Sequence, residues 1–317
     1  MELRICTEPQ EGATYAQLLA VAHAAREHGF AGFFRADHVL PMSGRPVLPG
    51  PVEAMVSLAA IAAQVPGIRL GTLLTAATFR YPAMLAIQAA NIDEISGGRL
   101  ELGLGAGWFE AEHLAYGLPF GASFGERFDR LTEQLEILTG LWATQSGGTF
   151  DYAGRYYQLT GAPGLPKPLQ HAADGTPKVP LVLGGHGTRR TPALAARFAD
   201  DFNTGFASVA ATGAQIGRVR SACEAIGRDP AAIVYSAVQL VCLGSDAATL
   251  ARRLAATGRP PAEFADGGLA GSPGQIADKL AAFARAGVQR MYLTVLDLSD
   301  TDHLAELGEL NRLAAGL

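Results

Sequence analysis

Apolar segments of two kinds alternate along the chain. Short runs such as residues 30–36, FAGFFRA, are apolar at nearly every position, which is typical of strands buried on both faces of a parallel sheet. Longer runs such as residues 123–142 repeat apolar side chains every three or four positions, which indicates helices with one buried face. The pattern predicts strands at residues 3–7, 30–36, 68–75, 99–105, 179–185, 200–205, 234–244 and 290–296. It predicts helices at residues 14–29, 52–65, 82–96, 123–142, 190–198, 211–226, 272–286 and 301–315.

Eight strand–helix units in one run of 317 residues predict an α/β protein, a (β/α)8 barrel that forms a single domain over residues 1–317. Two stretches rich in glycine and proline interrupt the alternation, at residues 143–178 and 256–271. Long loops in a compact domain are usually functional, so we expect insertions at the barrel mouth. Within the first of them, residues 149–159 are expected to form a small hairpin.

Composition and charge argue against several classes of protein. The chain carries 25 basic and 30 acidic residues, a formal net charge of -5, and no basic run of five or more, which argues against nucleic acid as a partner. No apolar stretch is long enough to span a membrane, and the first residues lack a secretory signal. The three cysteines are scattered without metal or disulfide spacing, which suggests a reducing compartment. We therefore expect a cytoplasmic protein.

Catalytic groups of a barrel lie at the carboxyl ends of its strands. After the second strand comes the sequence RADH, in which His38 can carry a proton near neutral pH and Asp37 can hold its tautomer; a histidine that merely caps the loop is the alternative. After the fifth strand, residues 184–190, GGHGTRR, open a helix. Such a turn suits a phosphate, with Arg189 and Arg190 adding charge, although an ordinary tight turn would look the same.

The end of the fourth strand raises a separate question. Residues 98–113, GRLELGLGAGWFEAEH, hold three glycines spaced G-x-G-x-G, which lacks the dinucleotide fingerprint and leaves a phosphate cradle or a flat floor as alternatives. The acids and histidine that follow lack the H-E-x-x-H pattern, so no metal is expected. The motif G-x-S-x-G of a nucleophile elbow is also absent from the sequence.

Several long segments together resemble a known family. Residues 48–120, from LPGPVEAMVSLAAIAAQV to GAGWFEAEHLAYGLPF, are similar to the luciferase-like monooxygenase superfamily, and more closely to its branch of reductases and dehydrogenases that use the deazaflavin coenzyme F420. The segments GFAGFFRADHVL, RFDRLTEQLEILTGLW, VPLVLGGHGTRRTPALAARFADDFN and SPGQIADKLAAFARAGVQRMYLTVLD resemble it as well. The resemblance therefore covers nearly the whole chain.

The resemblance implies where a cofactor would bind. The deazaflavin ring would lie over the barrel mouth, on the bulge at Leu73 and Leu74 where F420-using relatives often have a non-proline cis peptide. Ala106 and Gly107 would flank the ring, so that the glycines leave clearance for a flat tricycle. The phosphate would reach the strand-five turn, at Gly184, Gly185, Gly187, Thr188 and Arg189. Asp37 and His38 would meet the reactive edge.

The substrate side departs from part of the family. Sugar-phosphate dehydrogenases of this branch carry a glutamate at the position of Trp108 and a lysine soon after the sixth strand, where this chain has NTGFASVAATG. A hexose phosphate is therefore not expected, and Trp108 and Glu110 are assigned to the substrate pocket. The resemblance also implies a homodimer, for which the apolar helices 52–65 and 82–96 are candidates.

These observations favour an F420-dependent oxidoreductase. A hydride would pass between C5 of the deazaflavin and a small organic substrate, with reduction of an electron-poor C=C or C=N bond as the expected reaction. His38 would carry the proton and Asp37 would orient it. The alternatives are a monooxygenase or reductase that uses FMN, and a flavin-binding barrel without catalysis.

Overall fold

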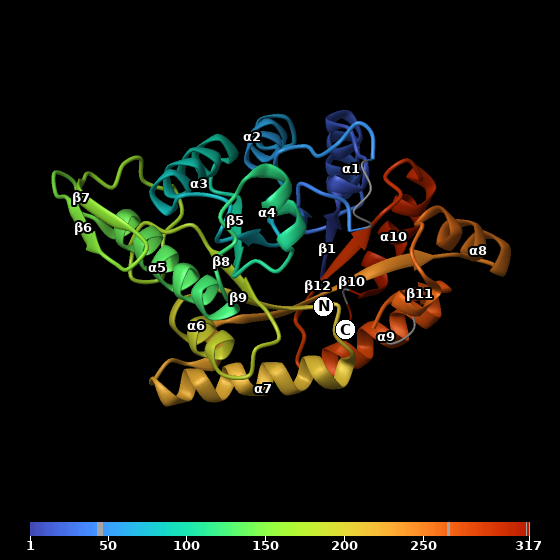
Figure 1. Cartoon of the computed structure of the whole chain (residues 1–317). Helices are drawn as coiled ribbons and strands as arrows, with labels where there is room; N and C mark the ends of the chain where they lie inside the picture. The colour runs from blue at the N-terminus through green and yellow to red at the C-terminus, as the bar shows by residue number, and fades with distance from the viewer. Residues whose placement is uncertain (43–46, 265–266, 315, 317) are drawn as a thin grey trace.

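The computed structural model describes residues 1–42, 47–264, 267–314 and 316 and shows a closed barrel of eight parallel strands (Figure 1). Strand β1 pairs with β12 on one side and with β2 on the other, which closes the ring. All eight predicted strands and the predicted fold class are confirmed. Around the barrel the strands are β1 (Glu2–Thr7), β2 (Gly32–Arg35), β3 (Arg69–Thr72), β5 (Leu100–Gly105), β8 (Leu181–Gly184), β9 (Asp201–Gly205), β10 (Val234–Leu243) and β12 (Arg290–Val295).

Helices cover the outside of the barrel, and successive helices pack side by side, as α1, α2 and α3 do along the upper edge of Figure 1. The eight predicted helices are confirmed to within two residues, and residue 315 lies outside the described part of the chain. They are α1 (Tyr15–Glu27), α2 (Ala54–Gln64), α3 (Pro82–Ser96), α5 (Phe124–Ala143), α6 (Arg190–Phe198), α7 (Val209–Ala225), α9 (Pro273–Arg285) and α10 (Thr301–Ala314). None of the helices in the described part of the chain is long and apolar enough to cross a membrane.

Local capping chemistry explains why these helix boundaries follow the sequence closely. Thr14 accepts a hydrogen bond from the backbone N–H of Gln17, whose side chain bonds back to the backbone of Thr14, and Ser272 makes the same reciprocal pair at the start of α9. Helix α3 ends at Gly97, which has a φ of 69° in the left-handed region that glycine adopts without a Cβ penalty. Start and stop signals are therefore local properties of the chain.

Other elements were not predicted. The third strand is split, because β3 ends at Thr72 and a two-residue strand β4 (Thr75–Ala76) follows it. Helices α4 (Glu110–Tyr116) and α8 (Ala247–Ala256) and the short strand β11 (Leu269–Gly271) were also missed, since each is too short to show a clear period. The expected hairpin is confirmed as β6 (Phe150–Ala153) and β7 (Gln158–Ala162), beside α5 in Figure 1. Residues 265 and 266 of the second interruption lie outside the described residues.

The barrel interior is layered along its axis. At the amino-terminal end, Arg4, Glu101, Asp201 and Arg290 form a network of buried ion pairs. The guanidinium of Arg4 lies 5.1 Å from the ring centre of Phe34, which belongs to a second, mainly apolar layer. That layer supports the carboxyl-terminal mouth, where strand ends and loops can present chemical groups to solvent.

Candidate active site

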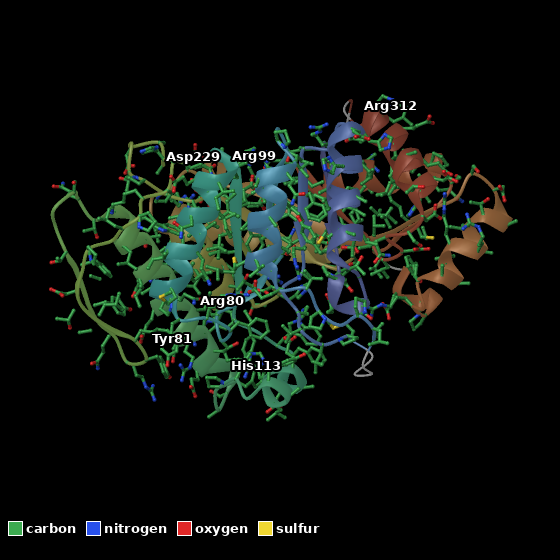
Figure 2. The ribbon with its side chains drawn as sticks, turned by 90° about the horizontal axis from the view of Figure 1, so that it is seen from above. Arg80, Tyr81, Arg99, His113, Asp229 and Arg312 are labelled. Carbon is green, nitrogen blue, oxygen red and sulfur yellow. The ribbon has the colours of Figure 1, made fainter. Side chains whose placement is uncertain are left out.

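A cavity of about 1040 Å³ opens at the carboxyl-terminal end of the barrel. Figure 2 shows the two ends of the molecule: Arg99 and Asp229, which precede strands, lie at one end, and Arg80, Tyr81 and His113, which follow strands, lie at the other. The cavity is lined by the ends of strands from both halves of the chain and by residues of the second interruption. Its volume suits a large planar cofactor together with a small substrate.

His38 and Glu112 form the main acid–base pair of the cavity. The Nδ1 atom of His38 lies 3.0 Å from one carboxylate oxygen of Glu112 and 3.2 Å from the other. Glu112, 1% exposed in α4, also accepts the backbone N–H of Val39 at 3.1 Å. A carboxylate only accepts hydrogen bonds, so Nδ1 carries the proton and Nε2 is left for the cavity. The pair can therefore hold a proton and present it in one orientation.

Asp37 does not orient His38, which corrects the expected pairing. Its carboxylate is 3% exposed and forms a two-pronged ion pair with Arg80, in which Nη2 lies 3.2 Å from Oδ1. Arg80 also bonds to Glu53 at the start of α2. Successive residues after a strand point to different sides, so Asp37 turns outward to the helices while His38 turns into the cavity. Asp37 therefore anchors the loop that carries His38.

The cavity floor is built from the split third strand. The peptide bond between Leu73 and Leu74 is cis, and both side chains line the cavity with Ala106 and Gly107. A Cβ on Gly103 would collide with the carbonyl oxygen of Thr72 and approach Leu74 Cδ2 to 2.8 Å. Gly103 thus makes room for the bulged strand beside it, and clearance for a flat ring stays a prediction for Gly105 and Gly107, which line the cavity. Gly107 has a φ of 82°, where other residues are strained.

The glycine turn after β8 presents unpaired backbone N–H groups. Gly184, Gly185 and Gly187 line the cavity as expected. The side-chain amide of Gln215 donates to the carbonyl oxygens of Gly185 at 3.1 Å and Gly187 at 2.9 Å, which holds those carbonyls toward α7. Within the described part of the chain, no acceptor binds the backbone N–H groups of residues 186–188. Such donors, at the start of a helix, are of the kind that binds anions in proteins.

A hydroxyl that the sequence did not single out completes this turn. Thr191 lines the cavity and is 5% exposed, and its Oγ1 has no hydrogen-bond partner among the described residues. A Cβ on Gly187 would lie 2.6 Å from that oxygen, so glycine allows the turn to pass this close to the buried hydroxyl. Thr75, also in the cavity wall, has a second buried hydroxyl without such a partner. Buried polar groups normally have a partner, so these two hydroxyls are candidates for contact with a bound polar ligand.

Thr188 and the two arginines do not face the cavity. Thr188, Arg189 and Arg190 are exposed and lie outside its lining. Arg190 bonds instead to Asp129 and to the carbonyl oxygen of Gly125 on α5, and it stacks over Phe128. The structure therefore gives these three side chains no place in the cavity lining, and the groups that the turn presents there are backbone N–H groups.

Two residues after β5 are expected in the substrate pocket, and the structure places only one of them in the cavity lining. Trp108 lines the cavity at 63% exposure and stacks on Phe109, with ring centres 5.2 Å apart. Glu110, expected in the substrate pocket, is exposed at the start of α4 and lies outside the cavity lining, because the helix turns it outward. Buried His113 accepts from the Thr78 hydroxyl at 2.6 Å and donates to the Phe109 carbonyl at 2.9 Å, so it holds α4 in place.

Comparison with known proteins gives one family. The model of the luciferase-like monooxygenase family matches residues 2–260. An F420-dependent glucose-6-phosphate dehydrogenase of Segniliparus rotundus is 29% identical over 224 residues, which cover 68% of this chain and 62% of that protein. An FMNH2-dependent dimethylsulfone monooxygenase of Pseudomonas putida is 32% identical over 146 residues, 46% of this chain and 38% of that one. The chain spans between 38% and 66% of the length of these curated relatives and of mycobacterial ones.

A solved structure agrees over the whole fold. An F420-dependent secondary alcohol dehydrogenase in complex with an F420-acetone adduct superposes with a TM-score of 0.83, covering 98% of this chain and 97% of that one. The two sequences are 18% identical, so this likeness concerns the barrel fold. The names of these relatives thus include both F420-dependent and FMN-dependent enzymes.

Proposed function

Because the chain belongs to the luciferase-like monooxygenase family, we propose that it is an F420-dependent oxidoreductase that transfers a hydride between the deazaflavin and a small organic substrate. The observation that carries the proposal is the pairing of His38 with Glu112 in the same cavity as the unpaired backbone N–H groups of the glycine turn after β8. One end of the cavity suits the cofactor's phosphate, and the other offers a positioned proton carrier to the substrate.

The residues present fit such a cofactor. Leu73, Leu74, Ala76 and Ala106 offer an apolar surface against which a flat ring can lie. The backbone of Gly184, Gly185 and Gly187 and the free hydroxyl of Thr191 would hold the phosphate. When bound, the deazaflavin supplies the carbon that gives or takes the hydride, and the protein supplies position and a proton.

His38 performs the proton step in this proposal. Glu112 holds Nδ1–H, which keeps the ring oriented and stabilises the charge when Nε2 is protonated as well. Trp108 lies beside it, with ring centres 5.6 Å apart, and shields that side of the imidazole from bulk water. Asp37 and Arg80 fix the loop behind them.

The direct test of the proposed function is which cofactor the protein binds. We expect the protein to bind F420 with a Kd in the micromolar range or tighter, equivalent to about 8 kcal/mol, in a fluorescence titration. Thr191→Val should weaken that binding about 10- to 100-fold, because it removes a hydrogen bond to a charged group. Arg190→Ala, whose side chain pairs with Asp129, is the matched control and should leave the Kd unchanged. Tight FMN binding without F420 binding would support an FMN-dependent enzyme instead.

We also propose that the protein is a homodimer. Helices α2 and α3 pack together and expose Val56, Met84 and Ile95 at 71%, 56% and 49%. Apolar patches on the outer ring of a barrel usually mark a partner. Light scattering should give twice the 33.1 kDa mass of the chain, and Met84→Glu should shift the protein toward the monomer. A monomeric mass for the unmodified chain at working concentration would contradict the proposal.

A further inference from the structure

The substrate end of the cavity is acidic. We define it by the charged and aromatic lining residues that lie away from the glycine turn: Glu8, His38, Trp108, Glu112, Arg259 and Glu263. Among these described residues three are carboxylates and one is a guanidinium. Glu8 follows β1, whereas Arg259 and Glu263 come from the second interruption, so the acidity is assembled from distant parts of the chain.

The guanidinium of Arg259 is already shared by carboxylates. Its Nη2 lies 2.9 Å from Glu8 and 3.2 Å from Glu11, and its Nη1 lies 3.8 Å from Glu263. An anionic substrate would therefore have to displace these partners while it faced the carboxylates themselves. Charges of one sign around a recessed site raise the local concentration of ligands of the opposite sign. This end of the cavity should thus reject carboxylates and phosphates.

We propose that the substrate is cationic at its reacting group: an imine that is bound as its iminium ion and reduced to an amine. The inference rests on the proposed function and names its substrate class. In the reaction, a hydride from the reduced deazaflavin forms a C–H bond at the imine carbon and the C=N π bond breaks. The π electron pair becomes the lone pair of the amine nitrogen, which keeps the proton that Nε2 of His38 gave to the imine, and the deazaflavin is oxidised.

The acidic lining favours this substrate for a physical reason. A nearby carboxylate stabilises the protonated form of a basic nitrogen and raises its pKa, so more of the bound imine is iminium. The carbon of the iminium ion is more electrophilic than the carbon of the neutral imine, so it accepts a hydride more readily. Burial also raises the pKa of Glu8, which the charge of Arg259 opposes, and His38 lies close enough to lower it. A cation bound beside Glu8 would act in the same direction as Arg259 and oppose the rise in this pKa.

A binding experiment tests the charge preference without turnover. Calorimetry on the protein, with and without oxidised F420, would compare three five-membered ring compounds: 2-methylpyrrolidinium, cyclopentanone and cyclopentanecarboxylate. The cation should bind at least tenfold more tightly than the anion in either state. Glu8→Gln should reduce that preference about tenfold, whereas Glu309→Gln, an exposed acid on α10, should leave it unchanged. Equal or tighter binding of the carboxylate would overturn the proposal.

A turnover experiment then tests the reaction. With reduced F420, the kcat/KM for 2-methyl-1-pyrroline should exceed that for 2-methylcyclopent-2-enone, a neutral electron-poor alkene of similar size, by at least tenfold. A preference for the enone would overturn the imine assignment. If cations bind selectively but F420 does not bind, the proposed function fails while the charge preference stands. If Glu8→Gln is thermally unstable, Glu263→Gln provides a second variant. An unchanged preference for the cation over the carboxylate in that variant would count against the proposal.

Discussion

Replacing His38 with alanine is expected to lower single-turnover hydride transfer by about 10²–10⁴-fold, the usual contribution of a positioned general acid or base. Binding of F420 should remain within roughly tenfold, about 1.4 kcal/mol, because the glycine turn and the bulged floor are untouched. Both quantities are measured on one preparation, by a fluorescence titration and then by rapid mixing with substrate. A normal rate in the variant would show that another group, or water, carries the proton.

Two further variants distinguish the role of Glu112, the hydrogen-bond partner of His38, from that of Asp37, its neighbour in sequence. Glu112→Gln should slow turnover about 10- to 100-fold, since it weakens a hydrogen bond to a charged group worth about 1.5–3 kcal/mol. It should also shift the pH profile of kcat, which a purely structural residue would not do. Asp37→Asn should mainly reduce thermal stability, because its carboxylate pairs with Arg80. A larger catalytic loss in Asp37→Asn than in Glu112→Gln would restore Asp37 as the orienting group.

Glu101→Ala should lower the free energy of unfolding by about 3–5 kcal/mol, the typical result of removing one member of a buried ion pair. Glu101 accepts two hydrogen bonds from Arg4, at 2.6 and 3.1 Å, and Arg4 is 1% exposed. Urea denaturation measures the change directly. Glu309→Ala is the control, because its pair with Arg312 is exposed and should contribute less than about 1 kcal/mol. A loss no larger than that of the control would show that the network is not stabilising.

The same residue predicts a dependence on pH. Burial would raise the pKa of Glu101, but the charges of Arg4, Arg290 and Arg69 outweigh it and lower the pKa from its ordinary 4.5 to about 2. A group with a lowered folded-state pKa contributes stability above its unfolded pKa and loses it as the pH falls. Unfolding free energy should therefore decline between about pH 4.5 and 2, and less steeply in Glu101→Gln. Parallel slopes in the two proteins would contradict this assignment.

Much of the site was visible in the sequence because it depends on local signals. His38 follows a buried strand, and Gly184, Gly185 and Gly187 precede a helix, so the sequence alone places both at the barrel mouth. The bulge at Leu73 and Leu74 was identified from resemblance and lies in the cavity floor. Glu112 is one of the acids that follow the fourth strand, but its seven-residue helix leaves no clear pattern in the sequence, and without that helix its reach to His38 could not be inferred.

The sequence by itself determined the order of strands and helices, the closure of eight units into a barrel, and the end at which chemistry would lie, because these follow from periodicity, capping and chain direction. Tertiary structure alone decided which side chains meet. Glu112 is 74 residues from His38, Gln215 reaches the turn from α7, and Arg259 lies 251 residues from Glu8. Such pairs leave no mark in local hydrophobic patterns, since a side chain's partner depends on how distant segments pack and not on its neighbours in the chain.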